Sequence, residues 1–143
     1  MKAKFKKLYM DWARRCADLS HARRLHVGAV VVKDDTVISY GYNGMPAGWD
    51  NNCEDEVFQQ DGISALKTKP EVLHAESNAI AKLARSTNSG LGATLFVTHG
   101  PCIECSKLIH QTGISRVYYS EDYRDSAGID FLRQSGVEVE KFD

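Results

Sequence analysis

Two short stretches, His74-Ala75-Glu76 and Pro101-Cys102-Ile103-Glu104-Cys105, concentrate the reactive side chains of this chain. One imidazole and two thiols are ligands of the kind that Zn²⁺ prefers, and the spacing of Cys102 and Cys105 lets both reach one ion from a single helical turn. Three protein ligands leave the fourth position of a tetrahedral zinc ion open for water, which is typical of a catalytic site. The sequence therefore predicts a zinc site made by His74, Cys102 and Cys105.

Glu76 follows the histidine by two residues. A carboxylate there is close enough to handle the protons of a zinc-bound water without binding the metal, so we interpret Glu76 as a general acid and base. The alternatives are a closed structural zinc site and a chance pair of buried thiols. A structural site needs neither Glu76 nor an open coordination position, which favours the catalytic interpretation.

Length and composition point to a water-soluble globular protein. The chain has 143 residues, 43% of them hydrophobic and 26% charged, with a formal net charge of -1. We therefore expect one domain, residues 1–143, and no nucleic-acid partner, which would call for a basic excess. No apolar run approaches membrane-spanning length and no signal-peptide core follows the basic start, so we expect a cytoplasmic protein with no membrane partner.

Helix and strand patterns alternate around the two stretches. A helix is predicted over residues 4–19, with an apolar face made by Phe5, Leu8, Tyr9, Trp12, Ala13, Cys16 and Leu19. β-branched runs predict a hairpin of strands 27–32 and 36–42 that turns at Asp34-Asp35. A second helix, 73–84, carries His74 and Glu76 in its first turn. A third helix begins at Pro101, a residue favoured at the first helical position. The remaining elements are strands at 93–98, 115–120 and 137–141 and a helix at 126–134.

This order of elements predicts an α/β fold. A hairpin followed by strands separated by helices indicates a mixed five-stranded sheet with helices on both faces, in three α/β/α layers. His74 and the cysteine pair both fall at helix N-termini, so they are expected to bind one ion between two helices. The positive end of a helix also favours the thiolates that zinc requires.

Two loops interrupt this regular pattern. The first, Gly41-Tyr42-Asn43-Gly44-Met45-Pro46-Ala47-Gly48, is a tight turn rich in glycine that is expected to expose backbone N–H groups. The second, residues 49–70, is polar and is predicted to be irregular. An insertion of that length in a compact domain is usually functional or disordered.

The chain resembles the cytidine deaminase superfamily and, within it, the deoxycytidylate (dCMP) deaminases. His-x-Glu and Pro-Cys-x-x-Cys are the superfamily's signature, whereas Gly-Tyr-Asn-Gly-x-Pro-x-Gly and Asp-Tyr-x-Asp-Ser point to the dCMP branch. The matching stretches are Val27-Gly28-Ala29-Val30, residues 41–48, residues 74–80, residues 101–109 and Asp122-Tyr123-Arg124-Asp125-Ser126.

The resemblance implies a cytidine deaminase-like fold and hydrolytic deamination of dCMP to dUMP and ammonia, which supplies dUMP for thymidylate synthesis. It also implies a homo-oligomer, usually a hexamer. The alternatives are a tRNA adenosine deaminase or another cytosine deaminase with the same chemistry, and a non-catalytic zinc-binding module. The net charge and the dCMP-type loop disfavour tRNA, and Glu76 disfavours a module without catalysis.

The resemblance further implies that Asn43 holds the sugar hydroxyl, that Ala75 packs on the base and that Tyr123 is a lid or a stacking ring. Other interpretations remain open: Asn43 suits a turn at positive φ, and Tyr123 suits an ordinary core position.

A phosphate site is expected near the first buried strand, where a hydroxyl stands beside guanidinium groups at Ser20, Arg23 and Arg24. A solvated turn is the alternative for the arginines. Arg85, also counted among the expected substrate contacts, matches a family position that reaches a neighbouring subunit, and a favourable position at a helix C-terminus is its alternative.

The resemblance also implies control by dCTP as activator and dTTP as inhibitor, each with Mg²⁺, at a nest of N–H groups in the glycine-rich loop. The remaining thiols, Cys16 and Cys53, are expected to be buried and free, and the alternative is a second, structural zinc site of the kind that some dCMP deaminases carry. The expected allosteric contacts are Tyr42, Asn43, Gly44, Met45, Gly48 and Asp50.

Overall fold

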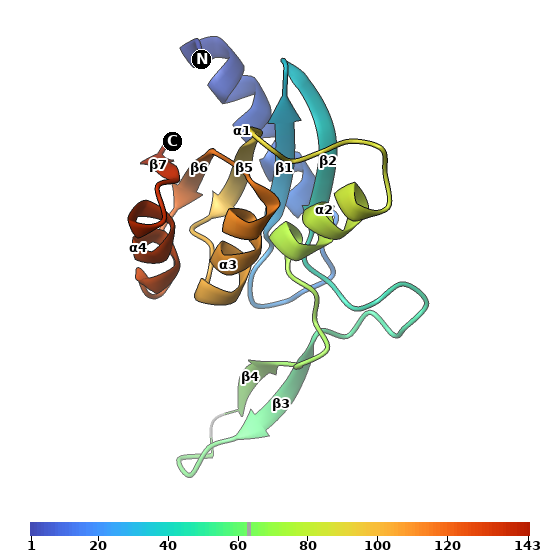
Figure 1. Cartoon of the computed structure of the whole chain (residues 1–143). Helices are drawn as coiled ribbons and strands as arrows, with labels where there is room; N and C mark the ends of the chain where they lie inside the picture. Colours follow the sequence, from blue (N-terminus) through green and yellow to red (C-terminus); the bar gives the residue numbers. More distant parts are fainter. Residues whose placement is uncertain (63) are drawn as a thin grey trace.

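A mixed five-stranded sheet forms the centre of the computed structural model, which describes residues 1–62 and 64–143 (Figure 1). The strands run in the order β2-β1-β5-β6-β7. β1 is antiparallel to both β2 and β5, whereas β5, β6 and β7 are mutually parallel, which confirms the predicted mixed sheet. The bounds are β1 Gly28–Lys33, β2 Thr36–Tyr42, β5 Thr94–His99, β6 Arg116–Glu121 and β7 Glu138–Lys141.

Helices cover both faces of this sheet and confirm the three-layer architecture. Successive strand residues alternate between two cores because side chains point to opposite faces. Val30 and Phe96 pack under α1, Ala3–Ala17, whereas Val31 and Leu95 pack under the opposite layer. That layer holds α2 Ala75–Ala84, α3 Ile103–Thr112 and α4 Ala127–Gln134.

The hairpin between β1 and β2 turns where it was predicted to turn. Asp34 and Asp35 have φ angles of 50° and 58°. Two consecutive left-handed residues are what a tight two-residue hairpin loop requires, and aspartate tolerates that conformation.

The buried face of α1 differs from the predicted one. Tyr9, Ala13 and Cys16 are buried as expected, but Leu8 and Trp12 of the same apolar pattern are 51% and 46% exposed. Met10 takes the central position in the core instead. The apolar pattern on α1 is wider than one packing face, so helical spacing alone did not separate the buried side from the exposed one.

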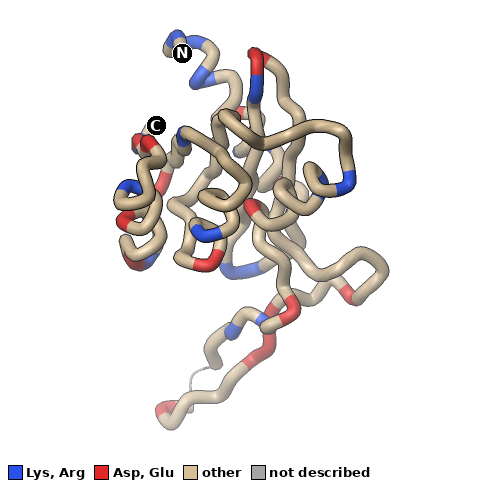
Figure 2. Tube along the Cα trace, viewed as in Figure 1, with Lys and Arg blue, Asp and Glu red and all other residues tan. Residues whose placement is uncertain are grey.

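The prediction that residues 49–70 are irregular is wrong, because a second, two-stranded sheet forms there. β3 (Glu54–Phe58) and β4 (Ser64–Thr68) pair antiparallel in a hairpin that projects from the body (Figure 1), and acidic residues gather along β3 (Figure 2). Neither strand lies against the central sheet, so neither needs the alternating apolar pattern by which strands are recognised. Residue 63, within this stretch, lies outside the described residues.

Among the described residues, the longest helix is α1, and none of the helices has the length and apolar character needed to cross a membrane.

Gly41 lets β2 approach α2 closely. A Cβ atom at position 41 would lie 2.3 Å from the carbonyl oxygen of Ala75 and 2.8 Å from the amide nitrogen of Ala79. Both atoms belong to the helix backbone and have little freedom to move away. The absence of a side chain at Gly41 therefore sets how α2, and the residues at its N-terminus, sit on the sheet.

Gly41→Ala is expected to destabilise the fold by about 1–3 kcal/mol, because overpacking forces backbone shifts. For a chain of this size the melting temperature should fall by roughly 3–10 °C in thermal unfolding followed by circular dichroism. Gly44→Ala is the control, since a Cβ there would meet nothing within 4 Å and its φ lies outside the left-handed region. Equal melting temperatures for the two variants would contradict the close approach.

Candidate active site

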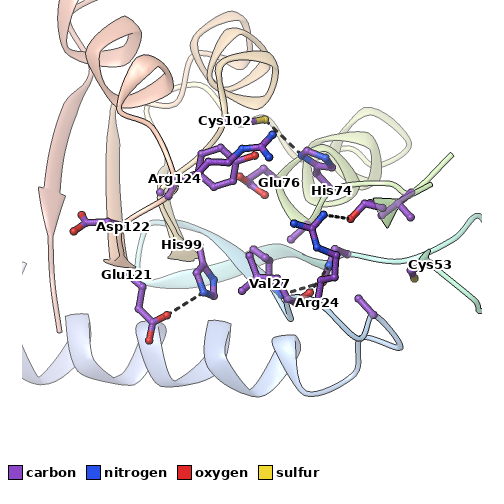
Figure 3. A pocket seen from close by; sticks show the side chains of 18 of the residues that line it. Arg24, Val27, Cys53, His74, Glu76, His99, Cys102, Glu121, Asp122 and Arg124 are labelled. Atoms are coloured by element: carbon purple, nitrogen blue, oxygen red, sulfur yellow. Dashed lines mark hydrogen bonds and ion pairs between the residues drawn. The ribbon is translucent and has the colours of Figure 1, made fainter. Parts of the chain in front are cut away.

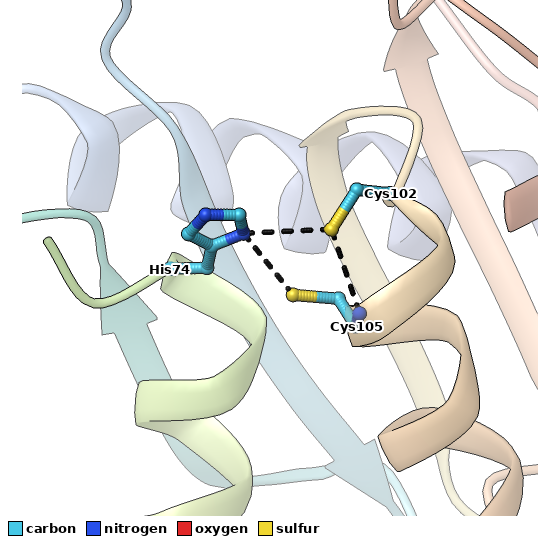
Figure 4. A group of neighbouring side chains, drawn as sticks. All are labelled: His74, Cys102 and Cys105. Carbon is cyan, nitrogen blue, oxygen red and sulfur yellow. Dashed lines mark hydrogen bonds between the residues drawn. The ribbon is translucent and has the colours of Figure 1, made fainter. Parts of the chain in front are cut away.

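The three predicted metal ligands lie together at the N-termini of two neighbouring helices (Figure 4). His74 is the N-cap residue of α2 and Cys102 is the N-cap residue of α3, while Cys105 lies in the first turn of α3. Both helices therefore begin slightly later than predicted: His74 precedes the first turn of α2, and Pro101 lies just before the N-cap of α3. The ligands keep their places at the helix ends.

The spacing of the ligand atoms fits a zinc ion. The Nδ1 atom of His74 lies 3.6 Å from the Sγ atom of Cys102 and 3.3 Å from that of Cys105. All three ligand atoms lie within 4.8 Å of one another. A tetrahedral zinc ion holds nitrogen and sulfur ligands about 3.6 Å apart, given its usual bond lengths. The geometry and the chemistry of the donors thus both suit zinc.

The surroundings favour a thiolate at this site. A hydrogen bond from Cys105 and another from His74 lower the pKa of the Cys102 thiol to about 4, and the bond to Cys102 raises the pKa of Cys105. The backbone N–H of Cys105 donates to the Cys102 sulfur at 3.5 Å. Cys102 therefore caps α3 as an anion, where the helix dipole stabilises negative charge.

Glu76 lies in the first turn of α2 and is 4% exposed. Burial raises the pKa of its carboxyl group to about 7. A group with that pKa exchanges protons readily near neutral pH, which is what a general acid and base requires. Glu76 is thus equipped to move protons beside the metal ligands.

A cavity of about 580 Å³ opens onto these residues (Figure 3). Its volume is within the range of small-molecule sites. Of the predicted substrate contacts, it brings together Asn43, Ala75, Tyr123 and Arg24 with His74, Glu76 and Cys102. The other lining residues are Ala22, Leu25, Val27, Cys53, Glu54, Thr68, Val72, His99, Gly100, Glu121, Asp122 and Arg124.

Asn43 is tied to the segment that precedes β1. Its Oδ1 atom accepts from the backbone N–H of Val27 at 2.9 Å, and its Nδ2 atom donates to the carbonyl oxygen of Leu25 at 2.8 Å. Asn43 does not have a positive φ, so the alternative of a left-handed turn residue is wrong. Its amide keeps a second N–H and a second oxygen lone pair for a ligand.

Three of the predicted contacts lie apart from the cavity lining. Ser20 is buried, and its hydroxyl donates to the carbonyl oxygen of Asn43 at 2.8 Å. The Arg23 guanidinium turns toward the side-chain oxygen of Asn52, at 3.2 Å, beside the start of β3. Arg85 is exposed at the C-cap of α2.

The glycine-rich loop uses part of its backbone within the fold. The N–H of Asn43 donates to the carbonyl oxygen of Val27, and that of Gly44 donates to Leu73. Asp50 accepts from the N–H of Asn52 at 2.8 Å. The N–H groups of Asn43 and Gly44 are therefore not free to bind an anion. An anion-binding nest would depend on N–H groups of the other loop residues.

The sequence interpretation did not assign Arg124, His99 or Glu121 to the site. His99 and Glu121 form an ion-pair contact of 3.0 Å, and they end the parallel strands β5 and β6. Arg124 follows β6, with its guanidinium 5.4 Å from the ring centre of Tyr123. Their position at the carboxyl ends of two parallel strands could have identified them, because ligands often bind beyond those ends.

Cys16 and Cys53 are buried and free, as predicted. Over residues 1–62 and 64–143, His74, Cys102 and Cys105 form the one cluster of three or more potential metal ligands.

Comparison with known proteins places this geometry in a family. The model of the cytidine and deoxycytidylate deaminase zinc-binding region matches residues 3–121. The fold is similar to that of the dCMP deaminase of cyanophage S-TIM5, crystallised in complex with dCMP and dUMP, with a TM-score of 0.89 and 46% identity over 99% of both chains.

Two relatives from cellular organisms agree with this match. The chain is 39% identical to ComE operon protein 2 of Bacillus subtilis, over 93% of this chain and 68% of that protein. It is 35% identical to human deoxycytidylate deaminase, over 94% of this chain and 81% of that protein. Both similarities span the helices that carry the metal ligands. The chain therefore belongs to the cytidine and deoxycytidylate deaminase family.

Proposed function

We propose that this protein hydrolyses dCMP to dUMP and ammonia and so supplies dUMP for thymidylate synthesis. The observation that carries the proposal is the buried carboxyl group of Glu76 beside the His74, Cys102 and Cys105 cluster, on the wall of a nucleotide-sized cavity. The similarity to a dCMP deaminase that binds dCMP and dUMP supports the choice of substrate.

His74, Cys102 and Cys105 would hold the zinc ion. When bound there, zinc makes water a better nucleophile by lowering its pKa. Glu76 accepts a proton from the attacking water and passes it to N3 of cytosine. It then takes the remaining proton from the new hydroxyl group on C4 and delivers it to the amine, so that the C4–N bond breaks, ammonia leaves and C4 keeps its oxygen as a carbonyl. One carboxyl group with a pKa of about 7 performs both transfers, as base and then as acid.

The lining of the cavity supports a nucleotide substrate. Asn43 binds the sugar hydroxyl, Ala75 packs against the base and Tyr123 covers it. Arg24 and Arg124 place two guanidinium groups on the cavity wall, where they bind the 5′-phosphate. Neither Ser20 nor Arg23 lines the cavity, so any role of theirs in phosphate binding is through the segment that carries Arg24.

The proposal also covers the oligomeric state and the cellular location of the protein. The protein acts as one domain, residues 1–143, in the cytoplasm, without nucleic-acid or membrane partners. It assembles as a homo-oligomer, as a hexamer, with the exposed Arg85 directed at a neighbouring subunit. The exposure of Arg85 at the end of α2 supports that direction.

Regulation by nucleotides is the last part of this proposal. dCTP with Mg²⁺ activates and dTTP with Mg²⁺ inhibits, by binding at the glycine-rich loop through Tyr42, Gly44, Met45, Gly48 and Asp50. Asn43 belongs to that loop and also lines the cavity. A nucleotide that moves the loop therefore moves a substrate contact.

Cys102→Ala and Cys105→Ala are each expected to lose zinc and activity together, because two remaining ligands cannot close the site. Metal analysis of purified protein by plasma mass spectrometry gives the zinc content, and the Cys16→Ala variant, at a buried thiol outside the cavity lining, serves as the thiol control. Full zinc occupancy in either ligand variant would show that the assignment is wrong.

Glu76→Gln is expected to keep zinc and the fold while the turnover of dCMP falls by about 10²–10⁴-fold or more, because no other carboxyl group replaces the proton carrier. Ammonia release from dCMP, measured in a coupled assay, checks the rate. Activity within a few-fold of the wild type would remove Glu76 from the mechanism, and a wild type that leaves dCMP unchanged would refute the proposed function.

Nucleotide regulation predicts that dCTP–Mg²⁺ raises the rate at low dCMP and that dTTP–Mg²⁺ lowers it. Coupling of the usual size would change substrate affinity by about 5–150-fold. Initial rates at sub-saturating dCMP, together with calorimetric titration of each triphosphate, make the measurement. Unchanged rates and no heat of binding at millimolar nucleotide would leave the loop without a regulatory role.

A further inference from the structure

Residues 20–27, here called the strap, join α1 to β1 and form one wall of the cavity. The strap has no helix or strand of its own. Its contribution to the cavity lining is Ala22, Arg24, Leu25 and Val27. A segment without its own backbone ladder needs other partners to hold its N–H and carbonyl groups in place.

Two side chains supply partners for the strap, one within the glycine-rich loop and one after it. Asn43, at the start of the loop, binds the C-terminal half of the strap through Val27 and Leu25. Glu54, at the start of β3, binds the middle of the strap. The strap is thus fastened from both ends of the stretch between β2 and β3.

The contacts of Glu54 are unusual for a carboxylate on a projecting hairpin. Its side chain is only 1% exposed. Its Oε2 atom accepts from the backbone N–H groups of Arg23 and Arg24, both at 2.9 Å, and Oε1 lies 3.2 Å from the N–H of Arg23. The Arg23 guanidinium lies 3.6 Å away and adds an opposite charge. A buried carboxylate is costly unless such partners satisfy it.

This arrangement separates the two arginines. With both backbone N–H groups held by one carboxylate, consecutive side chains leave the strap in different directions. Arg23 lies along β3, where its Nη2 atom donates to the carbonyl oxygen of Glu54 at 3.2 Å. Arg24 lines the cavity, and its Nη1 atom donates to the hydroxyl of Thr68 on β4 at 3.2 Å (Figure 3).

We infer that Glu54 is a positioning residue that selects phosphorylated substrates by holding Arg24 in the cavity. The inference rests on the proposed function, since it assigns Arg24 to the 5′-phosphate of dCMP. It adds a reason for the β3–β4 hairpin to be present: β3 supplies the buried carboxylate, and β4 supplies the hydroxyl that orients the guanidinium.

Glu54→Gln tests this role with little change in volume. The amide oxygen can still accept from both N–H groups at the Oε2 position, but the NH₂ group then replaces Oε1 and faces the N–H and the guanidinium of Arg23, and the negative charge is lost. Loss of charged hydrogen bonds of this kind is expected to lower kcat/KM for dCMP by about tenfold or more, mainly through KM. Deoxycytidine, which lacks the phosphate, should keep its wild-type kcat/KM.

Glu56→Gln is the matched control. It makes the same change in charge on the same strand, at an exposed side chain whose contact with Arg23 is an ion pair of 4.0 Å. The control should leave kcat/KM unchanged for both substrates. An equal loss with dCMP and deoxycytidine in Glu54→Gln would overturn the inference, because it would indicate general damage or direct contact with the nucleoside.

A double-mutant cycle shows whether Glu54 acts through Arg24. Arg24→Ala should also lose preference for dCMP, and adding Glu54→Gln to it should cause little further loss, since effects transmitted through one residue are not additive. Fully additive losses would overturn the inference. If the wild type fails to deaminate dCMP, the proposed function itself is wrong. If the wild type prefers dCMP and the Glu54→Gln variant keeps this preference, only the inference about Glu54 is wrong.

A measurement on the zinc-loaded wild type covers the case in which Glu54→Gln does not fold. The backbone amides of Arg23 and Arg24 should be protected from hydrogen exchange, because both donate to a buried carboxylate. Exchange at the rate of an unstructured peptide would contradict the anchoring of the strap by Glu54 and would overturn the inference.

Discussion

The convergence of two helix N-termini on one face of the sheet is the constraint on which the site depends. His74 and Cys102 are both N-cap residues, and their ligand atoms lie 3.6 Å apart although they come from different helices. Helix N-termini favour negative charge, so the fold stabilises the thiolate as well as placing it. Gly128, at the start of α4, lets α4 pack closely against the N-terminus of α3, because a Cβ there would lie 2.1 Å from the carbonyl oxygen of Pro101.

The cavity beyond the ligands is assembled from parts of the chain that are far apart in sequence. β5 and β6 end in His99 and Glu121, and the residues after β6 bring Tyr123 and Arg124 to the same edge. The opposite wall is the strap, held by Asn43 and Glu54. One edge of the sheet thus faces a wall that is held in place by side-chain hydrogen bonds and not by a backbone ladder.

The central fold and the metal ligands could be predicted because their signals are local. β-branched runs mark the buried strands, and three metal-binding side chains at short spacing mark the zinc site. The β3–β4 hairpin could not be predicted, because strands that cover no core carry no apolar alternation. Arg124 and Glu54 were missed for another reason: their roles follow from contacts between distant segments. Arg23 lies along β3 whereas Arg24 lines the cavity, and this separation depends on one buried carboxylate that residue spacing does not reveal.

The central claim is that His74, Cys102 and Cys105 hold one zinc ion with a position left for water. X-ray absorption at the zinc edge of the zinc-loaded protein tests it most directly. The account predicts two sulfur neighbours at about 2.3 Å and two nitrogen or oxygen neighbours at about 2.0–2.1 Å. Loss of one sulfur neighbour in Cys105→Ser would accompany this result. Four protein ligands with three or more sulfurs, or a shell without sulfur, would contradict it.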